Sequence, residues 1–219
     1  MPVAFQDTLE AGHNVRLTRL PNFDSLASTP LQHRWQSQKM PAPVVVAIIR
    51  RMVTVADKRP ELRYLLIRRR GEPYRGRWAL VGGKWDFGES LATAVVREVL
   101  EETGLEAEFV ALRGIVSERL RPVGPSGTGA AHFLLLVCQV DARDGRAKEQ
   151  NEGAVAWFSS AQIETLQREA RIIPSDYVMM KRFDQAPAIS HYEADMLSQI
   201  ASGDSGSAGA RLVRFEEVS

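Results

Sequence analysis

The sequence has little cysteine, little net charge and no long apolar run. Cys138 is the single cysteine among 219 residues, so neither an internal disulfide nor a zinc site built from several thiolates can form within the chain. The longest apolar runs, 44–49 and 133–138, fall far short of the roughly 20 residues that a membrane helix needs. The formal net charge is +1, so no strong overall field recruits nucleic acid or an anionic membrane.

The N-terminal segment also lacks the marks of a targeting peptide. It has no basic stretch followed by an apolar core, as a secretory signal would. Asp7 and Glu10 argue against a transit peptide, since such peptides contain few acidic residues. The expected location is therefore the cytoplasm, and Cys138, in an apolar run, is expected to be a buried small hydrophobe.

Periodicity and turn residues predict one central domain with two extensions. Residues 1–42 have weak periodicity and form a predicted N-terminal extension, with a short strand near 15–20. The central domain is predicted at 43–170, and 171–219 is predicted as a helical extension with a Gly/Ser-rich linker at 202–210. Strands are predicted at 44–53, 62–67, 78–81, 109–116, 132–140, 154–158 and 211–218, and a loop at 121–130. Helices are predicted at 90–103, from Ser159 or Ser160 to about 170, after Tyr177, and at 191–200. Strands outnumber helices and surround one mid-chain helix, which indicates a mixed α/β sandwich.

The helix predicted at 90–103 has an unusual charge pattern. Glu98 lies three residues before Glu101 and four before Glu102, so the three carboxylates should share one face. Like charges at this spacing destabilise a helix by a few tenths of a kcal/mol per pair, and the C-terminal end is unfavourable for anions. The opposite face is predicted to pack in the core and consists of Ala92, Val96, Val99 and Leu100.

A cation should compensate these carboxylates. Arg97 can pair with Glu101 across one turn but cannot neutralise three carboxylates. Oxygen ligands without cysteine or a histidine pair favour Mg²⁺, or alternatively Mn²⁺, over zinc. The glycine turns at 82–83 and 88 allow backbone carbonyls to approach such an ion. Taken alone, the three glutamates are also compatible with a solvated acidic helix face.

The complete pattern around this helix resembles the Nudix box. That motif has a glycine, a glutamate six residues on, an Arg-Glu pair, two further glutamates and a glycine flanked by aliphatic residues. Every fixed position is filled here, by Gly83, Glu89, Arg97, Glu98, Val99, Glu101, Glu102, Gly104 and Leu105. The likeness extends over about 43–165, including Trp78 and the strand around Trp157, although Val81 stands where many members carry a proline. It implies the α/β Nudix fold, a mixed β-sheet sandwiched between α-helices.

The resemblance also implies an activity and roles for residues. The activity is Mg²⁺-dependent hydrolysis of a nucleoside diphosphate linked to another group, by attack of a metal-activated water. Glu98 and Glu102 would be the main metal ligands, and Glu101 would bind a further metal or help to activate water. A carbonyl near Gly82 or Gly83 would also bind the metal, and Arg97 would orient the carboxylates. Glu89 would support the loop or a water, and Gly104 would have a structural role.

Residues outside the motif complete the predicted site. A general base can come from the loop before the 154–158 strand, where Glu149 and Glu152 are the candidates and a solvated loop is the alternative. Arginines at 68–70 end a strand, and alternation places Arg68 and Arg70 on one face, where they could bind phosphate or only solubilise the strand end. Trp85, like its neighbour Phe87, could stack on a base or pack inward.

Substrate choice is left open by the sequence. ADP-ribose or a nucleotide sugar is preferred, although Pro122 lies slightly too far downstream to match the proline typical of ADP-ribose hydrolases. The alternatives are an oxidised nucleoside triphosphate, a nucleotide-sensing transcriptional regulator and RNA-end processing. The expected partner is a small nucleotide, without membrane or nucleic acid, and a homodimer could form through the residues before 43.

Overall fold

The computed structural model describes residues 40–54, 59–71, 74–121, 131–143, 145–150, 153–199 and 209–218. The strand predicted near 15–20, nearly all of the loop at 121–130 and most of the linker at 202–210 lie outside these residues, as does Glu152. No helix within the described ranges is long and apolar enough to cross a membrane.

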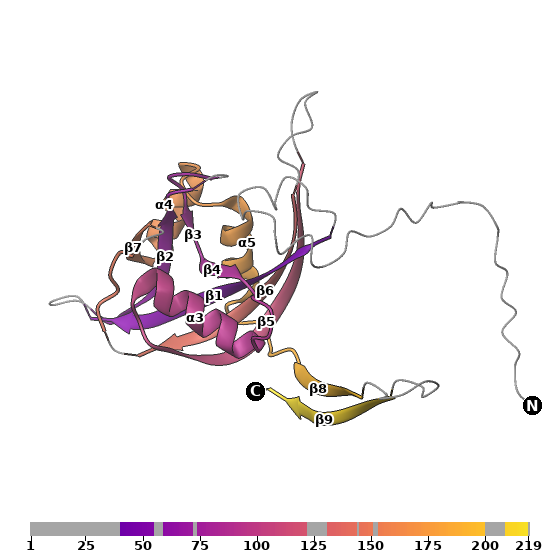
Figure 1. Cartoon of the computed structure of the whole chain (residues 1–219). Helices are drawn as coiled ribbons and strands as arrows, with labels where there is room; N and C mark the ends of the chain where they lie inside the picture. Colours follow the sequence, from indigo (N-terminus) through magenta and orange to yellow (C-terminus); the bar gives the residue numbers. More distant parts are fainter. Residues whose placement is uncertain are drawn as a thin grey trace, which may run out of the picture.

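Seven strands form one mixed sheet around a long central strand, β1 (Figure 1). β1 runs parallel to β6, whereas its first half also pairs antiparallel with β4 and its last residues pair antiparallel with β2. β3 and β7 extend the β2 side, and β5 pairs with β6. The strands are β1 (Ala42–Val53), β2 (Glu61–Arg69), β3 (Trp78–Ala79), β4 (Val81–Lys84), β5 (Ala107–Leu120), β6 (Ala131–Ala142) and β7 (Gly153–Ser159).

Helices cover both faces of this sheet. Alternate residues of β1 point to opposite sides, as the pleat requires. Val45 and Ala47 pack with helix α3 (Leu91–Thr103), whereas Val46 and Ile48 pack with α4 (Ser160–Arg168) and α5 (Pro174–Phe183). This arrangement confirms the predicted sheet between helices (Figure 1).

Helix α3 begins and ends as its sequence predicts. The Ser90 hydroxyl accepts a hydrogen bond from the Thr93 N–H at 3.0 Å, which satisfies one unpaired donor of the first turn. Gly104 adopts the left-handed conformation with φ 68°, and its N–H donates to the Leu100 carbonyl. These two caps place the Nudix-like glutamates in the last two turns of the helix.

The predicted division of α3 into an acidic face and a core face was wrong for Leu100, Glu98 and Glu102, whereas Val99 is buried as predicted. Leu100 is 49% exposed, whereas Glu98 and Glu102 are 8% and 3% exposed. The buried stripe instead runs through Leu91, Ala94, Val95, Glu98, Val99, Glu102 and Thr103. The reason is β4, where Gly83 has no side chain and leaves room for the Glu98 carboxylate, and where the Gly82 N–H donates to Glu102.

The segment 78–81 forms two strands rather than the one predicted. The Leu80 N–H donates to the Asp176 carboxylate at 2.7 Å instead of to a neighbouring strand. β3 therefore pairs with β2, whereas β4, the next strand along the chain, pairs with β1. This change of partner brings the glycines of β4 beneath α3.

The C-terminal region contains a β-hairpin where a helix was predicted at 191–200. Residues Tyr192–Gln199 form β8, which pairs antiparallel with β9 (Gly209–Glu217). Tyr192, Ala194 and Met196 alternate with Glu193 and Asp195, a period of two that suits a strand and not a helix. The helix predicted after Tyr177 is confirmed as part of α5, and the strand predicted at 211–218 is confirmed as β9.

Candidate active site

The carboxylates of Glu98 and Glu102 meet Gly82 and Gly83, which lie within strand β4 and not in the predicted turn. The Gly82 N–H donates to Glu102 Oε2 at 3.0 Å. A Cβ at Gly83 would lie 2.5 Å from the Glu98 carboxyl group. No side chain larger than hydrogen therefore fits at residue 83 unless Glu98 moves, so the strand and the helix form one site.

Arg97 holds the surrounding acidic groups together. Its guanidinium donates to both carboxylate oxygens of Glu89, at 2.7 and 2.9 Å, and to Glu98 Oε1 at 2.8 Å. It also donates to Glu101 Oε2 at 3.2 Å, as the sequence predicted, and to the Lys84 carbonyl at 3.0 Å. The hydrogen bonds from Arg97 lower the pKa of Glu89. The carboxylates of Glu89 and Glu98 in turn raise the pKa of Arg97. Arg97 thus links the loop before α3 to the metal-ligand candidates.

Glu101 differs from the other two glutamates of α3. Its side chain is 58% exposed, whereas that of Glu98 is 11% exposed. Among the described residues, no three Asp, Glu, His or Cys side chains come close enough to hold an ion by themselves. The site instead offers two buried carboxylates beside the backbone of Gly82 and Gly83. This all-oxygen donor set fits a hard cation that takes its other ligands from water or phosphate.

The segment 148–150 lies beside the C-terminal end of α3. The Lys148 N–H donates to the Thr103 carbonyl at 2.9 Å, and the Gln150 amide lies 3.0 Å from where a Cβ of Gly104 would be. Between them, Glu149 forms an ion pair with Arg70. The loop predicted to supply a general base is therefore near the glutamates of α3.

The predicted substrate-binding side chains are found in different surroundings. Arg68 is exposed and donates to the Gly76 carbonyl at 3.2 Å within the loop between β2 and β3. Trp85 packs against the core, and its indole N–H donates to the Glu89 carbonyl at 2.9 Å. The ring of Phe87 is fully exposed. Of the two aromatic residues, Phe87 is thus the one free to meet a ligand.

One contact of α3 had no signal in the sequence. Glu193 of β8 accepts a hydrogen bond from the Leu91 N–H at 3.0 Å. The two residues are 102 positions apart, and no motif or periodicity connects them. Only the tertiary structure reveals this interaction.

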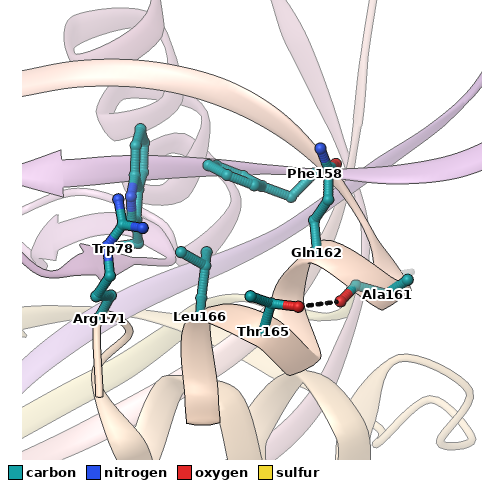
Figure 2. Close-up of a pocket in the computed structure, with 7 residues that line it drawn as sticks. All are labelled: Trp78, Phe158, Ala161, Gln162, Thr165, Leu166 and Arg171. Carbon is teal, nitrogen blue, oxygen red and sulfur yellow. Dashed lines mark hydrogen bonds between the residues drawn. The ribbon is translucent and has the colours of Figure 1, made fainter. Parts of the chain in front are cut away.

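A hollow of about 390 Å³ is lined in part by residues of α4 (Figure 2). Leu166 of its lining belongs to the buried cluster on the side of the sheet opposite α3, and Trp78 and Phe158 pack against that cluster. The rings of Trp78 and Phe158 form its wall in an edge-to-face arrangement, with centroids 4.7 Å apart. The lining residues are Trp78, Phe158, Ala161, Gln162, Thr165, Leu166 and Arg171. Because this hollow faces α4, it is separate from the carboxylate site.

The family of the chain follows from the motif, the fold and a direct family match. The model of the NUDIX domain matches residues 46–183, well over half of the chain. The chain belongs to the Nudix hydrolase family.

Particular relatives share part of this chain. The ADP-ribose pyrophosphatase of Methanocaldococcus jannaschii is 35% identical over 94 residues, 43% of this chain and 52% of that protein. The putative 8-oxo-dGTP diphosphatase 2 of Mycobacterium tuberculosis is 34% identical over 88 residues, 40% of this chain and 57% of that protein. This chain thus spans little more than half of each relative.

Solved structures support the same fold. A NUDIX hydrolase from Nitrosomonas europaea aligns with a TM-score of 0.51 and 23% identity over 66% of this chain and 89% of its own. The NUDIX domain of Shewanella oneidensis NrtR, complexed with ADP ribose, aligns with a TM-score of 0.50 and 19% identity. The alignment covers 74% of this chain and 96% of that domain. At these identities the similarity concerns the fold alone.

Proposed function

We propose that the chain hydrolyses the diphosphate linkage of a nucleoside diphosphate derivative with the help of a divalent cation. The observation that carries this proposal is the pair of buried carboxylates, Glu98 and Glu102, against the two glycines of β4. Burying two carboxylates one helical turn apart is unfavourable unless a cation compensates them. Arg97 is one such cation for Glu98, and the oxygen donors of the two carboxylates also suit a divalent metal ion.

Mg²⁺ is the preferred ion, with Mn²⁺ as an alternative, because the donors are oxygen atoms. Glu98 and Glu102 would hold it, assisted by a carbonyl at Gly82 or Gly83, with the exposed Glu101 available for a further ion. When bound, the cation lowers the pKa of water and offsets charge on the phosphate oxygens.

The chain itself orients these groups. Arg97 fixes Glu98 through a charge-assisted hydrogen bond and fixes Glu89 through two, so the loop 84–90 keeps its position relative to α3. Glu149 or Glu152 would accept a proton from the attacking water, and the described residues 148–150 of this segment lie next to the end of α3. Arg68 and Arg70 would bind phosphate oxygens, and for Arg70 this requires exchange of its Glu149 partner.

ADP-ribose is the first substrate to test, and nucleotide sugars are the next. The similarity to a protein named ADP-ribose pyrophosphatase supports this order. An oxidised nucleoside triphosphate is the second candidate, because another relative is named as an 8-oxo-dGTP diphosphatase. A regulator that senses a nucleotide would bind one of these compounds without turnover.

The test is a substrate panel with Mg²⁺, scored by the products formed. The double variant Glu98→Gln/Glu102→Gln should lose more than the roughly 100-fold typical of changes outside the first coordination shell. The matched control is Glu106→Gln/Glu108→Gln, which removes two exposed carboxylates on or beside β5 and should keep full turnover. Full activity of the Glu98/Glu102 variant, or no turnover of any diphosphate by the native chain, would overturn the proposal.

A further inference from the structure

The two ends of α3 carry an unusual distribution of charge. The first turn, Leu91–Thr93, contains no acidic residue, although carboxylates are favourable at the positive end of a helix. The acidic residues of α3 lie at the opposite end, where the helix dipole disfavours them. Apart from the Ser90 cap, the helix that carries the proposed metal ligands therefore lacks a carboxylate of its own in its first turn.

Glu193 supplies such a carboxylate from the C-terminal hairpin. Its Oε1 accepts the Leu91 N–H at 3.0 Å, and its Oε2 accepts from Arg214 Nη2 at 3.0 Å. His191 Nε2 lies 3.5 Å from the same Oε1. The Glu193 side chain is 14% exposed, so the contact is shielded from much of the solvent. Leu91 is the first residue of α3, and its N–H has no partner within the helix.

The orientation of the hairpin shows that this contact is specific. Glu193, Asp195 and Arg214 occupy one face of the β8–β9 pair, joined by ion pairs. Tyr192 and Phe215 stack on the other face and are 50% and 62% exposed. Burial of apolar surface would favour the reverse orientation. The hairpin is thus placed by its polar face, through Glu193, and lies beside α3 and apart from the large sheet (Figure 1).

We propose that Glu193 is a positioning residue for the metal-binding helix, and this inference rests on the proposed function. The hydrogen bond holds the N-terminus of α3, while the Gly82 N–H holds Glu102 near the other end. Because α3 is a rigid rod between these contacts, release of its first turn changes how Glu98 and Glu102 face β4. Glu193 thereby sets the affinity of the site for the cation without touching it.

The experiment compares Glu193→Ala, Glu193→Gln and the control Glu217→Ala in the full-length chain. Glu217 is an exposed carboxylate on β9, on the face of the hairpin that carries Tyr192. Two quantities are measured without substrate: hydrogen exchange of the Leu91 amide, and Mn²⁺ affinity by calorimetry. Glu193→Ala should accelerate the exchange and weaken Mn²⁺ binding, each by about tenfold.

The conservative variant separates positioning from a general loss of structure. The amide oxygen of Glu193→Gln can still accept the Leu91 N–H, so it should recover part of the exchange protection and part of the Mn²⁺ affinity. Glu217→Ala should match the native chain in both measurements. Unchanged Mn²⁺ affinity in Glu193→Ala, or equal losses in Glu193→Ala and Glu217→Ala, would overturn the inference.

Failure of this inference can be told apart from failure of the proposed function. If the native chain bound Mn²⁺ and hydrolysed a diphosphate, but Glu193→Ala bound Mn²⁺ equally well, only the positioning role would be wrong. If the native chain neither bound Mn²⁺ nor hydrolysed any diphosphate, the proposed function would be wrong, and with it the inference.

Discussion

At the scale of residues, the site depends on the glycines of β4, which carry no side chain. Gly83 leaves space that the Glu98 carboxylate occupies, and the Gly82 N–H binds Glu102 directly. The sequence motif predicted which residues belong together, and helical spacing predicted that Arg97 would reach Glu101. It could not predict that Glu98 and Glu102 are buried, because helical periodicity describes α3 alone and the space for them is provided by another strand.

Alanine at the two glycines should separate activity from stability. In Gly83→Ala the new Cβ meets the Glu98 carboxylate, the far end of a flexible side chain. We expect activity to fall by roughly tenfold or more, with less than about 1 kcal/mol change in the free energy of unfolding. In Gly82→Ala the Cβ meets the rigid backbone of Val45, so we expect a loss of about 1–3 kcal/mol. Chemical denaturation and steady-state kinetics measure both, and equal destabilisation by the two variants would contradict this account.

At the scale of elements, α5 belongs to the packed layer on the α4 side of the sheet. Met179 and Met180 lie in the same buried cluster as Val46 of β1. Asp184, which follows α5, accepts hydrogen bonds from Arg50 and Tyr64 at 3.1 and 2.9 Å. Amphipathic periodicity was sufficient to predict a helix here. It was not sufficient for 191–200, because short polar-apolar alternation suits a strand only when a second strand, β9, is available to pair with it.

A paired substitution tests the contact of α5 with β5. A Cβ on Gly114 would overlap the ring of Phe183, so Gly114→Ala should destabilise the fold by about 1–3 kcal/mol. Phe183→Leu removes that ring and should cost a comparable amount by itself. The double variant should be more stable than the sum of the two single losses predicts, because the overlap is gone. Strict additivity in urea unfolding would show that the two residues do not contact each other.

At the scale of the whole molecule, a largely buried acid ties stability to pH. The Asp176 carboxylate accepts the Leu80 N–H where β3 gives way to β4. Burial raises the pKa of Asp176 from 3.8 to about 7. The folded chain therefore binds this proton more tightly than the unfolded chain does. The contribution of this proton to the free energy of unfolding is fully present below about pH 4. It is lost as the pH rises from there through about 7.

Asp176→Asn should remove this contribution. The amide can still accept the Leu80 N–H but does not ionise, so the stability of the variant should fall less between pH 5 and pH 8 than that of the native chain. The difference over this window is at most about 3 kcal/mol, because only about two of the three pKa units of the shift lie above pH 5 and the residue keeps some exposure. Urea unfolding at both pH values measures it. Asp141→Asn, at an exposed position of β6, serves as the control.

The parallel pairing of β1 with β6 also constrains how the chain reaches its native state. Ala42 lies opposite Phe133 and Ile49 opposite Val140, so the middle of the sheet joins segments that are distant along the chain. Closing so long a loop costs entropy before any contact repays it, which slows folding relative to α3 or the β5–β6 hairpin. During synthesis, β1 therefore lacks its central neighbour until β6 has left the ribosome. In that interval the apolar residues of β1 can form non-native contacts.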